Sequence, residues 1–250
     1  MMDFTGQHVV ITGASTGIGR ATAGKIAALG GRVTLIARRS DLLEAAQREL
    51  GDGAAWAAAD VGDKAQLIAA LDAAVEQNGA IDGLFLNAAA EGAYAPTPDY
   101  PDEDFEQVLR VNVHSPFWAV KHVLPAMIER GRGAILITGS LGGETGMVGN
   151  PGYCASKHAV TGLAMCVAME AAPAGVRCNV IAPGFIDTPM LAGTPDDFKA
   201  MMAARVPQGR IGRPEEAANV AAFLLSDDAS HVTAQSWAVD GGLLGTLKIV

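Results

Sequence analysis

A tyrosine and a lysine four positions apart are the first side chains that could do chemistry together. Tyr153 follows Asn150-Pro151-Gly152, and Lys157 comes one helical turn later. Because Asn is a favoured helix cap and Pro suits the first helical position, the two side chains are predicted on one face of a helix start. An ammonium about 4 Å from a phenol contributes about 4 kcal/mol at an effective dielectric constant near 20, which lowers a tyrosine pKa from about 10 toward neutrality. The pair therefore predicts a general acid/base, although the same spacing alone is as often structural.

A glycine-rich turn is the second candidate. Residues 12–19 read Thr-Gly-Ala-Ser-Thr-Gly-Ile-Gly, directly after an apolar run and at the start of a helical pattern. Glycines in such a turn permit a tight exit from the strand and close approach of a pyrophosphate, and the helix N-terminus attracts the phosphates. The alternative is a purely structural turn. We expect a dinucleotide site that includes Gly13, Ser15, Thr16, Gly17, Ile18 and Gly19.

The choice of dinucleotide depends on the residues at the end of the next strand. An acidic residue there would bind the ribose hydroxyl of NAD, whereas arginine accommodates the additional phosphate of NADP. The chain has Arg38 and Arg39 and no carboxylate at this point. We expect NADP(H) as the cofactor; the alternative is that the two arginines form a solvated surface pair.

Short β-rich runs alternate with helical patterns along the whole chain. This order predicts an α/β fold: a single-domain, doubly wound parallel sheet of Rossmann type with helices on both faces. One dinucleotide-binding and catalytic domain over residues 1–250 is expected. A long helix is predicted over about 102–129, with a kink near Pro116. The least regular stretch, about 184–213, follows a strand end and is predicted to be a lid over the substrate.

Composition excludes several classes of partner. The chain has 250 residues, a net charge of −9 and no stretch of three basic residues, so we expect no nucleic-acid and no membrane partner. No run of 18 uncharged apolar residues and no signal peptide are seen. The three cysteines and five histidines show no ligand spacing, so no metal is expected. A cytoplasmic protein with a small-molecule substrate is predicted.

With these motifs in order, the chain resembles the classical short-chain dehydrogenase/reductase family over nearly its whole length. Further residues match the family's pattern one by one: Asp60-Val61, Asn87-Ala88-Ala89, Asn112, Ser140, Pro183-Gly184, Ile186, Thr188 and Val239-Asp240-Gly241-Gly242. Two positions depart from it, because Ala89 and Ala234 stand where the family commonly has glycine.

The resemblance implies a catalytic tetrad. Tyr153 would transfer the proton, Ser140 would orient the carbonyl oxygen, and Lys157 would bind the nicotinamide ribose and lower the Tyr153 pKa. Asn112 would hold a water that links Lys157 to solvent. The resemblance also implies cofactor contacts at Asp60, Val61, Asn87, Ala88, Pro183, Gly184, Ile186 and Thr188. It further implies a homotetramer whose interfaces include the long helices and residues 243–250.

The substrate is less sharply indicated. Candidate pocket residues are mostly apolar and favour a small, possibly cyclic ketone and its secondary alcohol: Leu141, Glu144, Met147, Asn150, Phe185, Met190, Leu191 and the insert 91–101. Glu144 could meet a polar substrate group or be a solvated loop carboxylate. The alternatives are a catalytically silent NADP(H)-binding sensor or scaffold, an isomerase or lyase, and, among reductases, an enzyme for 3-oxoacyl thioesters.

Overall fold

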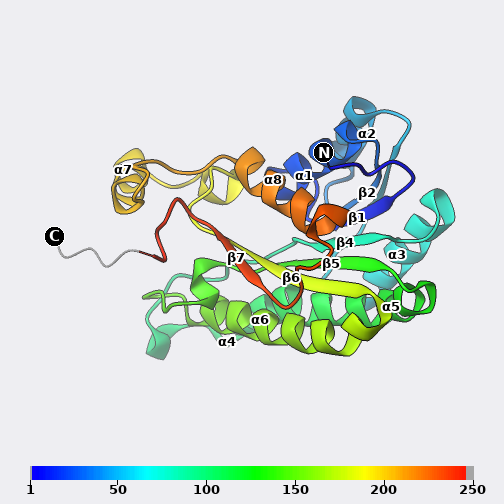
Figure 1. Cartoon of the computed structure of the whole chain (residues 1–250). Helices are drawn as coiled ribbons and strands as arrows, with labels where there is room; N and C mark the ends of the chain where they lie inside the picture. The colour runs from blue at the N-terminus through cyan, green and yellow to red at the C-terminus, as the bar shows by residue number, and fades with distance from the viewer. Residues whose placement is uncertain (1, 246–250) are drawn as a thin grey trace.

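The part of the chain that the structure describes folds around a sheet of seven parallel strands. The computed structural model describes residues 2–245. The strand order is β3-β2-β1-β4-β5-β6-β7, and Figure 1 shows helices on both faces of the sheet. The strands are β1 (His8–Thr12), β2 (Arg32–Ala37), β3 (Ala54–Ala58), β4 (Gly83–Leu86), β5 (Gly133–Thr138), β6 (Val176–Pro183) and β7 (Ser236–Val239). The helices are α1 (Gly17–Ala28), α2 (Ser40–Leu50), α3 (Lys64–Asn78), α4 (Asp102–Leu109), α5 (Ser115–Arg130), α6 (Pro151–Ala171), α7 (Asp196–Arg205) and α8 (Pro214–Leu225).

The doubly wound Rossmann-type fold predicted from the sequence is confirmed, and its two faces bury separate cores. Along β1, Val10 packs into the core under α3, α5 and α6, whereas Val9 and Ile11 pack into the core under α1, α2 and α8. Alternate residues of a strand point to opposite faces, so a strand buried on both sides reads as a continuous apolar run.

The strand order reverses between β1 and β4. The chain passes from β1 through β2 to β3 on one side, then returns to pair β4 with β1. In open sheets of this kind, ligands bind outside the carboxyl ends of the strands at such a reversal. Thr12 and Leu86, the last residues of β1 and β4, therefore mark the edge at which a cofactor site is expected.

The long helix predicted over 102–129 is interrupted earlier than expected. A π-helical turn at Arg110–His114 separates α4 from α5. Pro116 lacks the N–H that would bond the carbonyl of Asn112, and a wider turn over the preceding residues accommodates the missing bond. The irregularity thus lies before Pro116, and it contains Asn112, which is 2% exposed.

The stretch 184–213 contains a helix that the sequence pattern did not indicate. Within α7 only Met202 is buried, so the helix has no regular apolar face that a sequence pattern would show. Asp196 and Asp197 in the first turn and Arg205 in the last complement the helix dipole. The two ends of the stretch are joined where Ile186 pairs with Gly212. Among the described residues, no helix is long and apolar enough to cross a membrane.

Candidate active site

The turn between β1 and α1 is packed so closely against neighbouring backbone that two of its positions require glycine. Gly13 has φ of +65°, and a Cβ there would lie 2.8 Å from the Cα of Ala88. A Cβ at Gly19 would lie 2.6 Å from the carbonyl oxygen of Gly13. The α1 cap residue Thr16 makes no side-chain capping bond, and the first turn carries no acidic residue. The N–H groups of this helix start therefore suit a phosphate.

Hydrogen bonds between strand ends fix the carboxyl edge of the sheet beside this turn. The Thr12 hydroxyl accepts bonds from the N–H groups of Asn87 and Ala88 at 3.0 and 3.1 Å. The Asn87 side chain donates to the carbonyls of Thr12 and Gly13 and accepts from the Thr138 hydroxyl. Asn87 thus joins β1, β4 and β5. Thr12 and Thr138 were not singled out in the sequence; their position as the last polar residue of a buried strand was the available signal.

The two arginines after β2 differ in their contacts. Arg39 Nη2 donates to the hydroxyls of Ser15 and Thr16, both at 3.2 Å. Arg38 is exposed and makes no hydrogen bond or ion pair with the described residues. The structure therefore brings Arg39, and not Arg38, into contact with the glycine turn. Asp60, at the same edge after β3, accepts a bond from the Gly62 N–H at 2.9 Å, and Val61 is buried.

The segment after β6 reaches back to the same turn. A Cβ at Gly17 would lie 3.2 Å from the Thr188 methyl group, which places Thr188 against the glycine turn. Gly184 donates to the carbonyl of Val239 at 3.0 Å, just after Pro183 ends β6. Ile186 is buried. The predicted cofactor residues of this segment therefore lie at the carboxyl edge with those of the first turn.

Tyr153 lies in the first turn of α6, as predicted. Asn150 caps this helix, and its side-chain oxygen accepts a bond from the Tyr153 N–H at 3.3 Å. Asn150 is 1% exposed, so this predicted pocket residue is a buried cap and does not face a substrate. Lys157 is 1% exposed, its Nζ lies 5.5 Å from the centre of the Tyr153 ring, and it donates to the Thr138 carbonyl at 2.7 Å.

Burial governs the acidity of both groups. It raises the pKa of Tyr153, while a hydrogen bond with Ser140 lowers that pKa and the charge of Glu91 raises it. Burial also lowers the pKa of Lys157 to about 7. Burial thus opposes the lowering of the Tyr153 pKa that is expected from Lys157, because desolvation disfavours the charged form of each group, and the contribution of Lys157 itself stays a prediction. The neutral phenol is the form that this environment stabilises.

Asn112 joins the active-site helix to the segment after β4. Its side-chain oxygen accepts from the Ala90 N–H at 2.7 Å, and its Nδ2 donates to the Ala90 carbonyl and the Ser156 hydroxyl at 2.8 and 2.9 Å. The Ser156 hydroxyl in turn donates to the Tyr153 carbonyl at 2.7 Å. Asn112 is thus a clamp between two walls of the site, and its part in a water-linked proton path stays a prediction.

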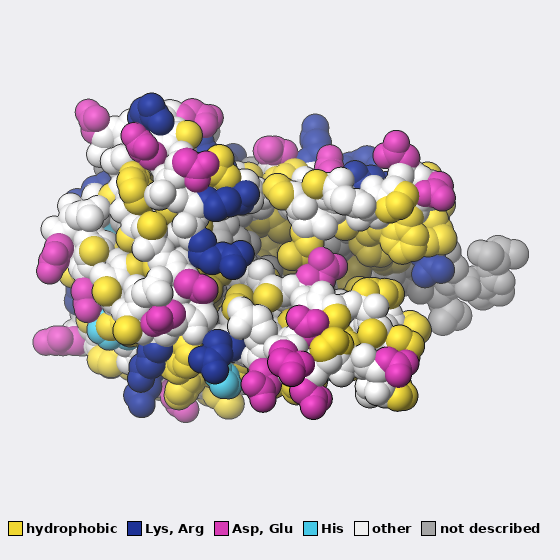
Figure 2. Space-filling view, turned by 180° about the vertical axis from the view of Figure 1, so that it is seen from behind, with side chains coloured by type: hydrophobic (Ala, Val, Ile, Leu, Met, Phe, Trp, Pro, Cys, Tyr) yellow, Lys and Arg dark blue, Asp and Glu magenta, His cyan; other side chains and the backbone are white. Residues whose placement is uncertain are grey.

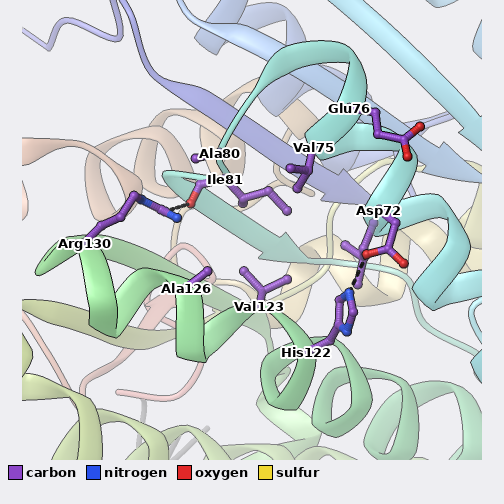
Figure 3. Close-up of a pocket in the computed structure, with 10 residues that line it drawn as sticks. Asp72, Val75, Glu76, Ala80, Ile81, His122, Val123, Ala126 and Arg130 are labelled. Carbon is purple, nitrogen blue, oxygen red and sulfur yellow. Dashed lines mark hydrogen bonds and ion pairs between the residues drawn. The ribbon is translucent and has the colours of Figure 1, made fainter.

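The contacts of the loop after β5 and of Phe185 show where some of the remaining pocket candidates lie. Gly142 lies against the Tyr153 ring and the Met147 sulfur, so the loop after β5 borders the site. Glu144 accepts a bond from the Ser236 hydroxyl at 2.9 Å and is thereby paired within the chain. Phe185 borders a hollow of about 290 Å³ near β7. A larger hollow, of about 480 Å³, lies between α3 and α5 (Figure 3), and none of the predicted site residues lines it.

The two departures from the family pattern have different backbone consequences. Among the described residues, Ala234 is the non-glycine residue with positive φ, at +58°. Ala89 therefore adopts ordinary angles, whereas Ala234 occupies a conformation that favours glycine. No group of three or more metal-ligating side chains converges within residues 2–245.

Comparisons with known proteins agree with this geometry. A family model described as "Enoyl-(Acyl carrier protein) reductase" matches residues 13–244. Levodione reductase of Leifsonia aquatica is 39% identical over 252 residues, which cover 96% of this chain and 94% of that protein. Cyclohexanol dehydrogenase of Acinetobacter sp. (strain SE19) is 40% identical, with 95% of each chain covered.

The solved structure of levodione reductase superposes with a TM-score of 0.94 at 38% identity, over 97% of this chain and 99% of that one. These relatives are named as a reductase and a dehydrogenase, and the glycine turn, the Arg39 contact and the Tyr153–Lys157 helix of this chain lie at one edge of the same sheet. The chain belongs to the classical short-chain dehydrogenase/reductase family and is an oxidoreductase of that family.

Proposed function

We propose that the protein is an NADP(H)-dependent carbonyl reductase and alcohol dehydrogenase for a small, largely apolar, cyclic ketone and its secondary alcohol. The observation that carries this proposal is the arrangement of Tyr153, Ser140 and Lys157 beside the glycine turn. Two relatives whose names include levodione and cyclohexanol support a ring-shaped substrate.

The contact of Arg39 supports NADP(H). Its guanidinium lies on the Ser15 and Thr16 hydroxyls at the start of α1, and the chain has no carboxylate at the end of β2. An arginine at this position provides charged donors for a phosphate on the adenosine ribose. Arg38 lies beside it with its guanidinium free for the same group.

The residues of the site have distinct roles in the proposed reaction. When bound, the cofactor supplies or accepts the hydride. Tyr153 donates a proton to the carbonyl oxygen in reduction and removes it in oxidation, and Ser140 donates a hydrogen bond to that oxygen. Lys157 binds the ribose hydroxyls next to Tyr153, and Asn112 positions the Ala90 segment against α6. The raised pKa of Tyr153 keeps its phenol protonated, which is the form that reduction requires.

A thioester substrate is the weaker alternative. Coenzyme A and related carriers bear phosphates, which basic side chains bind. The insert and α4 border the site with acidic residues, and residues 91–109 contain no lysine or arginine. This wall disfavours an anionic carrier.

The proposal also includes a homotetrameric assembly and a location in the cytoplasm. Large apolar side chains are exposed on α5 and α6, which suits burial in a homotetramer: Phe117, Ile128, Met165 and Met169. The predicted tail interface falls mainly at residues 246–250, outside the described residues. Sedimentation as a monomer would overturn the tetramer.

All three cysteines are unpaired, as a reducing cytoplasm favours.

The proposed activity is tested by following absorbance at 340 nm with a panel of cyclic ketones and alcohols, with each cofactor in turn. We expect consumption of NADPH with cyclic ketones and a higher kcat/KM for NADPH than for NADH. A preference for NADH would contradict the cofactor assignment. Cofactor binding without turnover would indicate the silent sensor, and product without net oxidation or reduction an isomerase or lyase.

A further inference from the structure

The insert 91–101 packs on the first turn of the helix that carries Tyr153. The Ala95 N–H donates to the Gly149 carbonyl at 2.8 Å. A Cβ at Gly152 would lie 2.9 Å from the Tyr100 hydroxyl oxygen, and a Cβ at Gly92 would meet the same atom. Tyr100 therefore connects the residue after Glu91 with the residue before Tyr153.

The other neighbour of Glu91 is fixed to the same helical turn. The backbone of Ala90 exchanges two hydrogen bonds with the Asn112 side chain, which also donates to Ser156. Ser156 donates to the carbonyl of Tyr153. Because both flanking residues are anchored, the backbone at Glu91 has a defined position against the helical turn that carries Tyr153.

The Glu91 carboxylate forms no hydrogen bond and no ion pair with any of the described residues. Although Glu91 is exposed, the packing around its carboxyl group raises its pKa, and its charge acts on Tyr153. Glu144, in the loop after β5, accepts a hydrogen bond from Ser236 instead. Glu91 is thus an acceptor without a partner among the described residues, on a segment that packs against the helical turn of Tyr153.

We propose that Glu91 is a specificity-determining residue, whose carboxylate accepts a hydrogen bond from a hydroxyl or ammonium group that the substrate carries away from its carbonyl carbon. An ionised carboxylate accepts hydrogen bonds and cannot donate them, so it selects for a donor and against a second anion. The substrate class is therefore a cyclic ketone with a second donor group, or the corresponding diol or amino alcohol. This inference rests on the proposed function and narrows its substrate.

The surrounding charge has the same sign. Acidic side chains gather on the lobe that faces α7 across the hollow in Figure 2. From the insert into α4 the acidic residues are Glu91, Asp99, Asp102, Glu103, Asp104 and Glu106. A surface of one sign disfavours approach of substrates of that sign, so anionic ketones are expected to react poorly.

The test compares four ketones that share one ring: cyclohexanone, 4-hydroxycyclohexanone, 4-aminocyclohexanone and 4-oxocyclohexanecarboxylate. The full chain and its Glu91→Gln variant are assayed with NADPH. Glu106→Gln, which removes the same charge from an exposed site on α4, is the matched control. Ratios of kcat/KM between two ketones within one variant do not depend on the fraction of folded enzyme.

We expect the wild-type enzyme to prefer the hydroxy or amino ketone to cyclohexanone by about tenfold or more in kcat/KM, mainly through a lower KM. One hydrogen bond to a charged group contributes enough binding free energy for such a preference. Glu91→Gln should remove most of this preference, change cyclohexanone turnover by less than about threefold, and improve use of the carboxylate. Loss of preference for the amino ketone alone identifies an ammonium ligand, and loss for the hydroxy ketone a hydroxyl ligand.

Unchanged ratios in Glu91→Gln, or equal losses in Glu106→Gln, would overturn the assignment of Glu91 while leaving the proposed function intact. Failure of the wild-type enzyme to reduce any of the four ketones, with either cofactor, would overturn both.

Discussion

The cofactor side and the substrate side of the carboxyl edge differ in how closely their backbones pack. At the turn after β1, a Cβ on Gly13 or Gly19 would come within 3 Å of neighbouring backbone atoms. In the stretch 184–213, a Cβ on Gly193 would meet nothing within 4 Å, although one on Gly184 or Gly212, at the two ends, would come within 3 Å of a neighbouring residue. The first region has one backbone arrangement, which its neighbours determine, whereas the second has room for a side chain at Gly193, between its anchored ends.

This contrast explains why the reaction class is easier to derive than the substrate. Cofactor binding depends on backbone N–H groups and glycines, whose positions follow from the strand–turn–helix order. Substrate choice depends on exposed side chains of the insert and of the segment that contains α7, where composition changes at little cost in stability. The predictions below test this division, from the largest expected effect to the smallest.

Lys157→Met should have the largest effect among these changes. It keeps the buried volume but removes the ammonium that lies next to Tyr153 and bonds the Thr138 carbonyl. We expect kcat to fall by at least about 100-fold, in the range of general acid–base contributions. Steady-state kinetics with NADPH and cyclohexanone provide the measurement. Lys64→Ala, at an exposed position, is the control, and equal rates in the two variants would contradict the assignment.

The pH dependence should differ between the two directions of the reaction. Burial raises the pKa of Tyr153, so its proton-donating form persists as pH rises and is lost only above that raised pKa. Alcohol oxidation needs the phenolate and should increase by about tenfold per pH unit until that pKa is reached. Ketone reduction should stay level through neutral pH. Initial rates from pH 6 to 10 in both directions measure this, and an oxidation rate independent of pH would contradict it.

Arg39→Ala should change cofactor preference. Loss of its charged donors beside Ser15 and Thr16 is expected to lower kcat/KM for NADPH by about 10- to 100-fold, since a hydrogen bond to a charged group contributes about 1.5–3 kcal/mol. The value for NADH should change by less than about threefold. Arg48→Ala on the exposed face of α2 is the control. A proportional loss with both cofactors would show that Arg39 acts on folding and not on phosphate binding.

A pair of glycine substitutions tests the backbone contrast itself. Gly13→Ala should lower the free energy of unfolding by about 1–3 kcal/mol and abolish cofactor binding, because its φ of +65° and its contact with Ala88 both disfavour a side chain. Gly193→Ala should change stability by less than about 0.5 kcal/mol. Denaturant unfolding and cofactor titration of both variants provide the comparison; similar losses in the two would remove the distinction between the regions.

The sequence predicted the elements whose pattern is local and missed those that depend on tertiary contacts. The parallel sheet, the turn after β1 and the Tyr153 helix follow from apolar runs, glycines and the Asn150-Pro151 start. The π-helical turn at Arg110–His114 and α7 do not, because neither presents a regular apolar face.

Two electrostatic features were also beyond the sequence. The spacing of Tyr153 and Lys157 predicts proximity but not burial, and burial raises the pKa of Tyr153, which opposes the lowering expected from Lys157. The packing of the Glu91 segment against α6 depends on the side chain of Asn112, whose partners Ala90 and Ser156 come from two distant segments. Such contacts follow from the fold and not from residue spacing.

The most direct measurement for the proton-transfer role is the rate of NADPH oxidation at 340 nm by Tyr153→Phe, together with its NADPH dissociation constant from fluorescence titration. The substitution removes one hydroxyl from a ring that the surrounding residues keep in place. We predict a loss of at least about 1,000-fold in kcat with a dissociation constant within about threefold of wild type. A near-wild-type rate in the folded, NADPH-binding variant would contradict the account.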